Sequence, residues 1–283
     1  MSVKVIADSA SDLNEEVIKK YDIEIIPSYV VFNEKSYKDG VEVKPEDIYR
    51  WSDENDQALT TSSPNFMEVA DIFNRYLEKY DGIVCIAVSA LLSGTYNVFR
   101  LAARETGKEE RIRVIDSKNL CSAEGLLVIK AKELADEGKD IDEIAKEIDE
   151  LKERLDSSFV LDTLDYIHRG GRCSDASHLL GMALKVHPKI VVENGVINVA
   201  KKYRGRMKKV YREYVDDLHD ELVNADKERC FLSDSGLEDD IEDIAVKLKE
   251  EYGFKEVLRA KAGCVISCNC GPGTMAVFFF RGK

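Results

Sequence analysis

The sequence lacks several features that mark common functional classes. It has four histidines in 283 residues, and none of them stands in an H-E-x-x-H pattern or beside a serine or cysteine in a catalytic dyad. It has no glycine-rich Walker or Rossmann loop. No apolar run approaches the roughly 20 residues that cross a bilayer, and the first residues lack the basic-then-apolar pattern of a signal peptide. We therefore expect a cytoplasmic protein that makes only transient contact with a membrane, if any.

Positive charge is also scarce. The chain has 41 lysines and arginines against 54 aspartates and glutamates, which gives a formal net charge of −13 at pH 7. A protein this acidic repels a phosphate backbone, so we expect no general binding of nucleic acid. Hydrophobic residues make up 44% and charged residues 34% of the chain, which is typical of a folded globular protein.

The seven cysteines are an odd number, and they are scattered through the chain. This pattern indicates reduced thiols in a reducing compartment and not a disulfide framework. Cys264, Cys268 and Cys270 are close enough in sequence to suggest a thiolate metal site. Their C-x₃-C-x-C spacing matches no known zinc pattern, and no fourth ligand lies nearby, so we expect no metal. A tight turn of small residues before a strand is the preferred interpretation.

The first half of the chain alternates between strand-like and helix-like segments. Strands are expected at residues 3–7, 23–26, 29–32, 83–88 and 112–115. Helices are expected from a cap at Ser11 or Asp12 to about Tyr21, and at residues 66–80, 96–105, 123–137 and 141–155. This alternation predicts a parallel sheet with helices on both faces.

The second half has a different pattern. A hairpin is expected at residues 191–199, around the Asn194-Gly195 turn. Further strands are expected at 230–233, 256–259 and 275–280, and helices at 207–223 and 237–252. The whole chain is therefore predicted to be an α/β protein of two domains. Residues 1–157 would form a parallel-sheet α/β domain, and residues 158–283 an α+β domain with a mainly antiparallel sheet. With no long Pro/Gly linker between them, the two should pack closely.

A run of hydroxyl side chains precedes one of the predicted helices. Pro64 suits the first turn of that helix, and Ser63 can cap it. The hydroxyls of Thr61 and Ser62 would then lie beside free N–H groups at the positive end of the helix, where an anion can bind. A capped helix with surplus hydroxyls explains the same residues.

A second hydroxyl-rich loop, Ser93-Gly94-Thr95, follows the most apolar predicted strand. Ligands of parallel sheets bind beyond the carboxyl ends of the strands. Gly94 would let a backbone N–H approach a ligand, although a tight loop without function is the alternative. The spacing differs from the G-x-S-x-G of hydrolases. Two such loops at successive strand-to-helix connections favour a shared anion site.

Three further features have both a functional and a structural interpretation. Asp8 could bind Mg²⁺ or orient a hydroxyl, but hydrogen bonding within its own loop is preferred. Arg169 and Arg172, on either side of Gly170-Gly171, suit a phosphate or a partner's carboxylates, or they offset a helix dipole. The basic cluster at 201–209 suits an acidic or phosphorylated partner, or is a solvated helix start.

The motifs together resemble the DegV family of bacterial fatty-acid-binding proteins. The resemblance extends over nearly the whole chain, from about residue 3, and each motif stands in the family's order. These motifs are DSASD at 8–12, TSSPN at 61–65, SGTYN at 93–97, LDYIHRGGR at 164–172, LKVHPKIVVENGVI at 184–197 and Gly-Pro-Gly at 271–273.

This resemblance implies a lipid carrier that is not itself an enzyme and needs no cofactor. A long-chain fatty acid such as palmitate, stearate or oleate would lie between the two domains. A separate fatty acid kinase would phosphorylate it there, for phospholipid synthesis. The family's carboxylate ligands correspond to Thr61, Ser62 and Ser93, and Gly94 and Thr95 line the same loop. The arginines that the family uses with the kinase correspond to Arg169 and Arg172.

The sequence departs from the family pattern at several positions. Asn269 stands two residues before Gly-Pro-Gly, where the family usually has a histidine that supports the carboxylate. Asparagine can donate a hydrogen bond there but cannot carry a proton near neutral pH. Asn65 and Gly205 replace a motif serine and a motif threonine. Two alternatives therefore stay open: a transferase of acyl or phosphoryl groups that uses Ser93 or Ser62, and a binder of another small anion.

Overall fold

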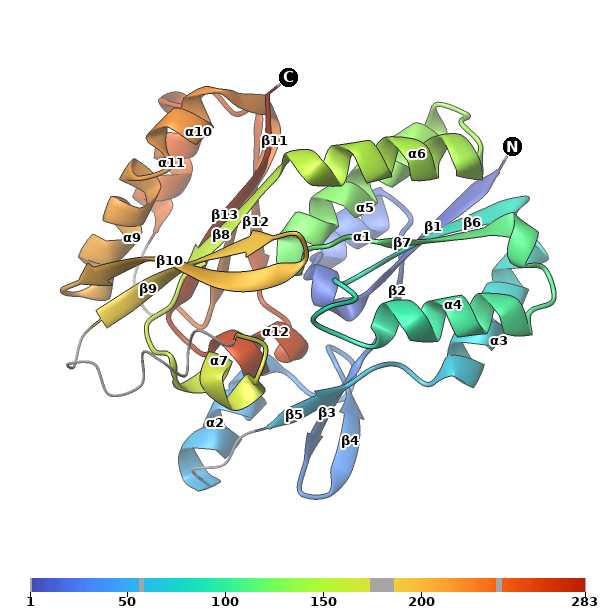
Figure 1. The fold of residues 1–283 in the computed structure, drawn as a ribbon, viewed down its shortest axis with the longest axis horizontal. Helices are drawn as coiled ribbons and strands as arrows, with labels where there is room; N and C mark the ends of the chain where they lie inside the picture. The colour runs from blue at the N-terminus through green and yellow to red at the C-terminus, as the bar shows by residue number, and fades with distance from the viewer. Residues whose placement is uncertain (1, 56–58, 174–185, 238–240, 283) are drawn as a thin grey trace.

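The fold was obtained as a computed structural model, which describes residues 2–55, 59–173, 186–237 and 241–282 (Figure 1). Leu184 and Lys185, the first residues of the LKVHPKIVVENGVI motif, lie outside the described residues.

The first sheet is parallel throughout, as the alternation of segments predicts. Its strands lie in the order β2 (Glu24–Ile26), β1 (Val3–Asp8), β6 (Gly82–Ala87) and β7 (Ile112–Asp116). Helices α3 (Phe66–Leu77) and α4 (Thr95–Glu105) cover one face, and α5 (Cys121–Asp136) and α6 (Ile141–Leu151) cover the other. Strand β6 is buried on both faces, which explains its uninterrupted apolar sequence.

A small antiparallel sheet extends from this domain. It has the order β4 (Lys35–Lys38), β3 (Tyr29–Phe32) and β5 (Thr60–Ser62). Helix α2 (Pro45–Asn55) lies between β4 and β5 in the chain. The sequence analysis predicted β3, but it missed α2, β4 and β5.

The second large sheet is antiparallel except for its β11–β12 pair. Its six strands lie in the order β10 (Val196–Arg204), β9 (Val186–Glu193), β8 (Leu155–Val160), β13 (Thr274–Arg281), β11 (Ala225–Ser235) and β12 (Glu256–Lys261). Among its described residues, this half has the helices α7 (Asp165–Gly170), α9 (Met207–Asp216), α10 (His219–Val223), α11 (Glu242–Glu250) and α12 (Cys264–Cys270). The predicted fold class, a parallel α/β part followed by a mainly antiparallel α+β part, is confirmed.

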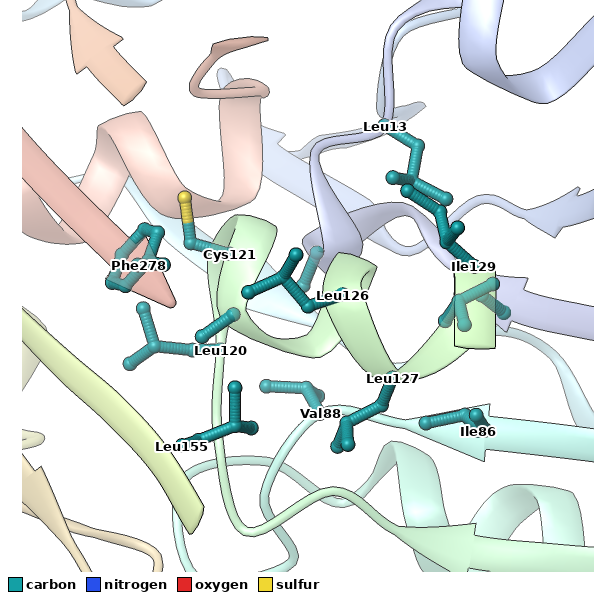
Figure 2. Close-up of a cluster of buried hydrophobic side chains, with 14 of the residues drawn as sticks. Leu13, Ile86, Val88, Leu120, Cys121, Leu126, Leu127, Ile129, Leu155 and Phe278 are labelled. Carbon is teal, nitrogen blue, oxygen red and sulfur yellow. The ribbon is translucent and has the colours of Figure 1, made fainter. Parts of the chain in front are cut away.

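One hydrophobic core joins the two halves. Figure 2 shows Ile86 and Val88 from the end of β6 beside Leu126 and Leu127 of α5, with Phe278 of β13 nearby. All five side chains belong to one buried cluster. Because α5 packs against both large sheets, the space between the halves is bounded by rigid elements.

Some predicted helix ends were wrong. Helix α1 (Glu15–Lys20) begins after Asn14, whose side chain accepts a hydrogen bond from Val17 N, so neither Ser11 nor Asp12 caps it. The chain first makes a 3₁₀ turn, η1 (Ser9–Ser11), because the Asp8 carboxylate accepts a hydrogen bond from Ala10 N. Short 3₁₀ turns also occur as η2 (Glu109–Arg111) and η3 (Lys152–Arg154).

Two predicted helices of the charged surface were too long. The helix predicted to reach residue 155 ends at Leu151, because Leu155 begins β8 and is buried in the second sheet. The helix predicted at 207–223 is divided into α9 and α10 by a turn at Asp217 and Leu218. In both cases the apolar spacing continues past the end of the helix.

Candidate functional site

The two predicted hydroxyl-rich loops meet in the structure. The Ser93 and Thr95 hydroxyl oxygens lie 2.9 Å apart, and the Thr95 hydroxyl donates a 3.4 Å hydrogen bond to the Ser63 hydroxyl. A Cβ atom on Gly94 would lie 3.1 Å from the Ser63 oxygen, so a larger residue there would require the Ser63 side chain to shift slightly. The result is a cluster of hydroxyls at the N-terminus of α4.

The cluster is held by the ends of the parallel strands. The Asp8 carboxylate at the end of β1 accepts hydrogen bonds from Ala10 N and Val88 N, both at 2.8 Å. The backbone carbonyl of Ser89 accepts hydrogen bonds from Leu92 N and Ser93 N, both at 3.0 Å. Burial raises the pKa of Asp8 to about 6. These contacts favour the local hydrogen-bonding role for Asp8 that the sequence analysis preferred.

The position of Thr61 and Ser62 differs from the predicted one. Both belong to strand β5, where they pair with Val30 and Tyr29 of β3. Helix α3 is capped by Asn65, whose side chain accepts hydrogen bonds from Met67 N and Glu68 N. The prediction that Ser63 caps this helix was therefore wrong. Asparagine is at least as good a cap as serine, and Pro64 lies outside the helix.

A cavity of about 430 Å³ opens beside the hydroxyl cluster. Six of the predicted site residues line it: Thr61, Ser62, Ser93, Gly94, Arg172 and Asn269. The structure places Thr95 behind Ser93, where it is fully buried. Arg169 lies on an exposed part of α7 and is not part of the lining.

The cavity has a polar mouth and an apolar interior. The exposed lining residues are Ser62, Leu91, Gly94, Asn97 and Arg172. The buried apolar lining residues are Ala10, Val88, Leu120, Phe159, Ile167, Ile197 and Cys270. Sequence reasoning missed Asn97 and most of the interior. Asn97 belongs to the SGTYN motif and could have been found there, but residues such as Phe159 and Ile197 carried no local signal.

A smaller inner cavity of about 30 Å³ lies next to the first. The two share Leu120, Phe159, Ile266 and Cys270. The inner cavity lies over a row of directly paired residues in adjacent strands, namely Phe159 of β8, Ala276 of β13 and Ser233 of β11. Phe278, on the same face of β13 as Ala276, lines its far side, in the core shown in Figure 2. The small side chain of Ala276 leaves the space between larger neighbours.

The three nearby cysteines lie in a helix, α12, and the predicted tight turn before a strand is limited to the Gly-Pro-Gly segment that follows, directly before β13. The first N–H groups of α12 are capped by side chains from far away in the sequence: Asp12 accepts from Gly263 N, and Asp39 accepts from Cys264 N, each at 2.8 Å. Burial raises the pKa of Asp12 well above its ordinary value. Since both caps come from the other half of the chain, local sequence could not reveal the helix.

Asn269 lies near the C-terminal end of α12, and its amide nitrogen donates a 2.8 Å hydrogen bond to the Val265 carbonyl. Its amide oxygen lies so close to Gly170 of α7 that a Cβ atom at position 170 would require the Asn269 side chain to move. The absence of a side chain at Gly170 therefore lets Asn269 of α12 pack against α7 at the mouth. Arg172 lies two residues further along the chain, and its guanidinium donates a hydrogen bond to the Gly170 carbonyl.

All seven cysteines are buried, with free thiols. Burial raises the pKa of Cys270 to about 11, so this thiol is protonated at neutral pH. Within the described ranges, no three histidine, cysteine, aspartate or glutamate side chains are grouped so that they could hold a metal ion. No helix in those same ranges is both long enough and apolar enough to cross a bilayer.

Comparison with known proteins gives one consistent result. The model of the DegV family, which is described as an uncharacterised protein family, matches residues 2–282. A DegV domain-containing protein of Caldanaerobacter subterraneus subsp. tengcongensis is 34% identical over 278 residues, which cover 98% of each chain.

Solved structures agree with this result. A DegV family protein from Thermus thermophilus, described by its fatty acid binding, has a TM-score of 0.91 at 28% identity, over 99% of this chain and 100% of its own. DegV of Bacillus subtilis, described as a fatty acid binding protein, has a TM-score of 0.85 at 28% identity, over the same shares of the two chains. The chain therefore belongs to the DegV family, as the order of its motifs predicts.

Proposed function

We propose that this protein binds one long-chain fatty acid and presents it to a fatty acid kinase. The observation that carries the proposal is the hydroxyl cluster at the mouth of an apolar cavity. The cavity volume of about 430 Å³ is within the range of about 300–1,000 Å³ that is usual for small-molecule sites. The fatty acid binding described for the Thermus and Bacillus proteins supports the same ligand class.

The ligand's carboxylate would lie among the hydroxyls of Thr61, Ser62 and Ser93, at the N-terminus of α4. Hydroxyls and helix N–H groups donate hydrogen bonds to an anion, and the helix dipole favours negative charge there. Thr95 orients the Ser93 hydroxyl, and Gly94 allows the loop to come near. Arg172 adds a positive charge at the mouth, and Asn269 replaces the histidine of the family with a neutral side chain that can hydrogen-bond.

The acyl chain would extend inward past Leu120 and Phe159 and end over Ala276. Each buried CH₂ contributes about 0.8 kcal/mol, so ten of them contribute about 8 kcal/mol before the costs of binding. A small anion without a long apolar tail would leave this interior unfilled. The shape of the site therefore favours a fatty acid over the alternative of another small anionic ligand.

The geometry gives less support to a serine-dependent transferase. The Ser93 hydroxyl bonds the hydroxyl and the backbone N–H of Thr95, and neither group is a base that could activate a nucleophile. The proposal is therefore a binding protein that relies on a partner for chemistry.

Replacement of the central hydroxyl tests the site. We expect Ser93→Ala to weaken palmitate binding about 10- to 100-fold, because a hydrogen bond to a charged group contributes about 1.5–3 kcal/mol. Isothermal titration of lipid-free protein with palmitate measures the change. Ser158→Ala is a control for the loss of a serine hydroxyl, since Ser158 is buried and bonds Tyr214, away from the cavity. Equal affinity of Ser93→Ala and wild type would remove Ser93 from the site.

The exposed arginines of the HRGGR motif suit the proposed kinase contact. Arg169 does not line the cavity, so we expect Arg169→Ala to bind palmitate as the wild type does. Its rate of acyl-phosphate formation with a fatty acid kinase should fall. A parallel loss of binding and phosphorylation would place Arg169 in the ligand site and not at the kinase contact.

A further inference from the structure

The β9–β10 hairpin reaches from the second sheet to the loop that carries Ser93. Figure 1 shows the hairpin extending toward the parallel-sheet half of the molecule. At its tip, the Ser89 hydroxyl donates a 2.7 Å hydrogen bond to the Gly195 carbonyl. Ser89 is fully buried, and Gly195 is buried even though it lies in a hairpin turn. Most hairpin turns project into solvent, so this one is docked.

The docked tip fits only glycine. Gly195 has a φ of +84°, which disfavours other residues. A Cβ atom there would lie 2.7 Å from the Ser89 hydroxyl oxygen and 3.5 Å from the Leu91 side chain. The hairpin therefore touches a residue of the cavity mouth, Leu91, and a residue directly behind it, Ser89.

Ser89 connects this contact to the proposed carboxylate site. Its hydroxyl holds the hairpin, while its backbone carbonyl accepts hydrogen bonds from Leu92 N and Ser93 N. Two residues beyond Gly195, Ile197 forms part of the cavity wall and is 8% exposed. Movement of the hairpin tip would therefore open the cavity wall next to Ser93.

We propose that Ser89 is a positioning residue that clasps the β9–β10 hairpin over the cavity, and that ligand exchange requires the hairpin to lift. This inference rests on the proposed function, because it concerns access to the same cavity. This hydrogen bond, the contact with Leu91 and the buried side chain of Ile197 hold the tip, so its opening breaks far fewer contacts than unfolding of the core. Loss of the hydrogen bond should therefore make the cavity open more often.

Thiol labelling measures this opening without any ligand. Cys270 lines the cavity, whereas Cys85 lies in the middle of the parallel sheet and reacts only when that sheet unfolds. Lipid-free protein is treated with N-ethylmaleimide, and peptide mass spectrometry follows both thiols. We expect Ser89→Ala to label Cys270 about fivefold faster than wild type, the factor expected for loss of one hydrogen bond. The ratio of the Cys270 and Cys85 rates should rise accordingly.

Ser158→Ala is the matched control, because it removes the hydrogen bond of another buried serine, on the opposite face of β8 from Phe159. It should leave the ratio unchanged. Gly195→Ala disturbs the same contact from the hairpin, because its Cβ would clash with the Ser89 hydroxyl. It should also raise the ratio of the Cys270 and Cys85 labelling rates. The proposal is overturned if the ratio is the same in Ser89→Ala, Gly195→Ala and wild type, or if it rises equally in Ser158→Ala.

A second readout separates this inference from the proposed function. Dissociation of bound palmitate should be faster in Ser89→Ala by the same factor as the labelling of Cys270. If wild type binds no palmitate, the proposed function fails, while the labelling ratio still decides whether the hairpin is clasped. If wild type binds palmitate and the variants release it at the wild-type rate, the clasp does not control exchange and the inference is overturned.

Discussion

The inner cavity makes a quantitative prediction about chain length. Ala276 lies between Phe159 and Ser233 on the floor of this cavity, and its small side chain leaves the space. Ala276→Leu adds three carbon atoms, which is more than enough to fill a cavity of about 30 Å³ and displace the roughly one CH₂ group of the ligand that this volume holds. At about 0.8 kcal/mol per CH₂, the longest bound chains would lose about 0.8 kcal/mol, or about fourfold in affinity.

The assay is a series of saturated fatty acids from C10 to C18, titrated into lipid-free protein. For the wild type, affinity should rise with each added CH₂ until the inner cavity is filled. For Ala276→Leu, the rise should stop about one CH₂ group earlier, with shorter chains unaffected. Val277→Leu is the control, because Val277 is equally buried but faces the opposite core cluster. An equal loss for every chain length in Ala276→Leu would refute the proposed path of the acyl chain.

Two further predictions concern the framework of the site. Gly170→Ala should lower the free energy of unfolding by about 1–3 kcal/mol, since its Cβ would collide with Asn269. Addition of Asn269→Ala to this variant should restore stability, as measured by urea unfolding. A urea midpoint of Gly170→Ala equal to that of wild type would contradict the described packing. The pKa of Asp8 is raised from 3.8 to about 6 in the folded state. Between these two pH values the folded state binds more protons than the unfolded state. The free energy of unfolding should therefore fall by about 3 kcal/mol as the pH rises from 3.8 through 6. Asp8→Asn should lose this part of the pH dependence when urea unfolding is measured from pH 4 to pH 7. If the free energy of unfolding of Asp8→Asn varies with pH as that of wild type does, Asp8 does not titrate in this range.

Much of the fold could be predicted because burial leaves a periodic signal. Strand β6 is apolar at every position since both of its faces are covered, and α3 repeats its apolar residues at helical spacing. The Asn194-Gly195 turn marked the β9–β10 hairpin correctly. In each case the signal itself lies within a short stretch of consecutive residues.

Other elements depend on contacts that sequence reasoning cannot see. Helix α12 has its caps on Asp12 and Asp39, more than 220 residues earlier in the chain. Strand β5 forms because Thr60–Ser62 pairs with β3, a contact that the predicted helix cap at Ser63 did not suggest. Tertiary contacts of this kind regularly override local preference.

The candidate site was likewise predicted only in part from the sequence. The hydroxyls of Ser93 and Thr95 were found because their loop follows a buried parallel strand, where ligand sites of such sheets lie. The inner cavity was not found, because it depends on the register of three strands that sets Ala276 between Phe159 and Ser233. No single segment of the sequence contains that information.

The central claim is that this protein carries a long-chain fatty acid. Native mass spectrometry of protein freshly purified from a bacterial host, followed by organic extraction, tests it most directly. The account predicts one fatty acid per chain, which is displaced by added palmitate and retained less well by Ser93→Ala than by Ser158→Ala. Protein that carries no lipid and also binds none of the C10 to C18 acids when they are added would contradict it.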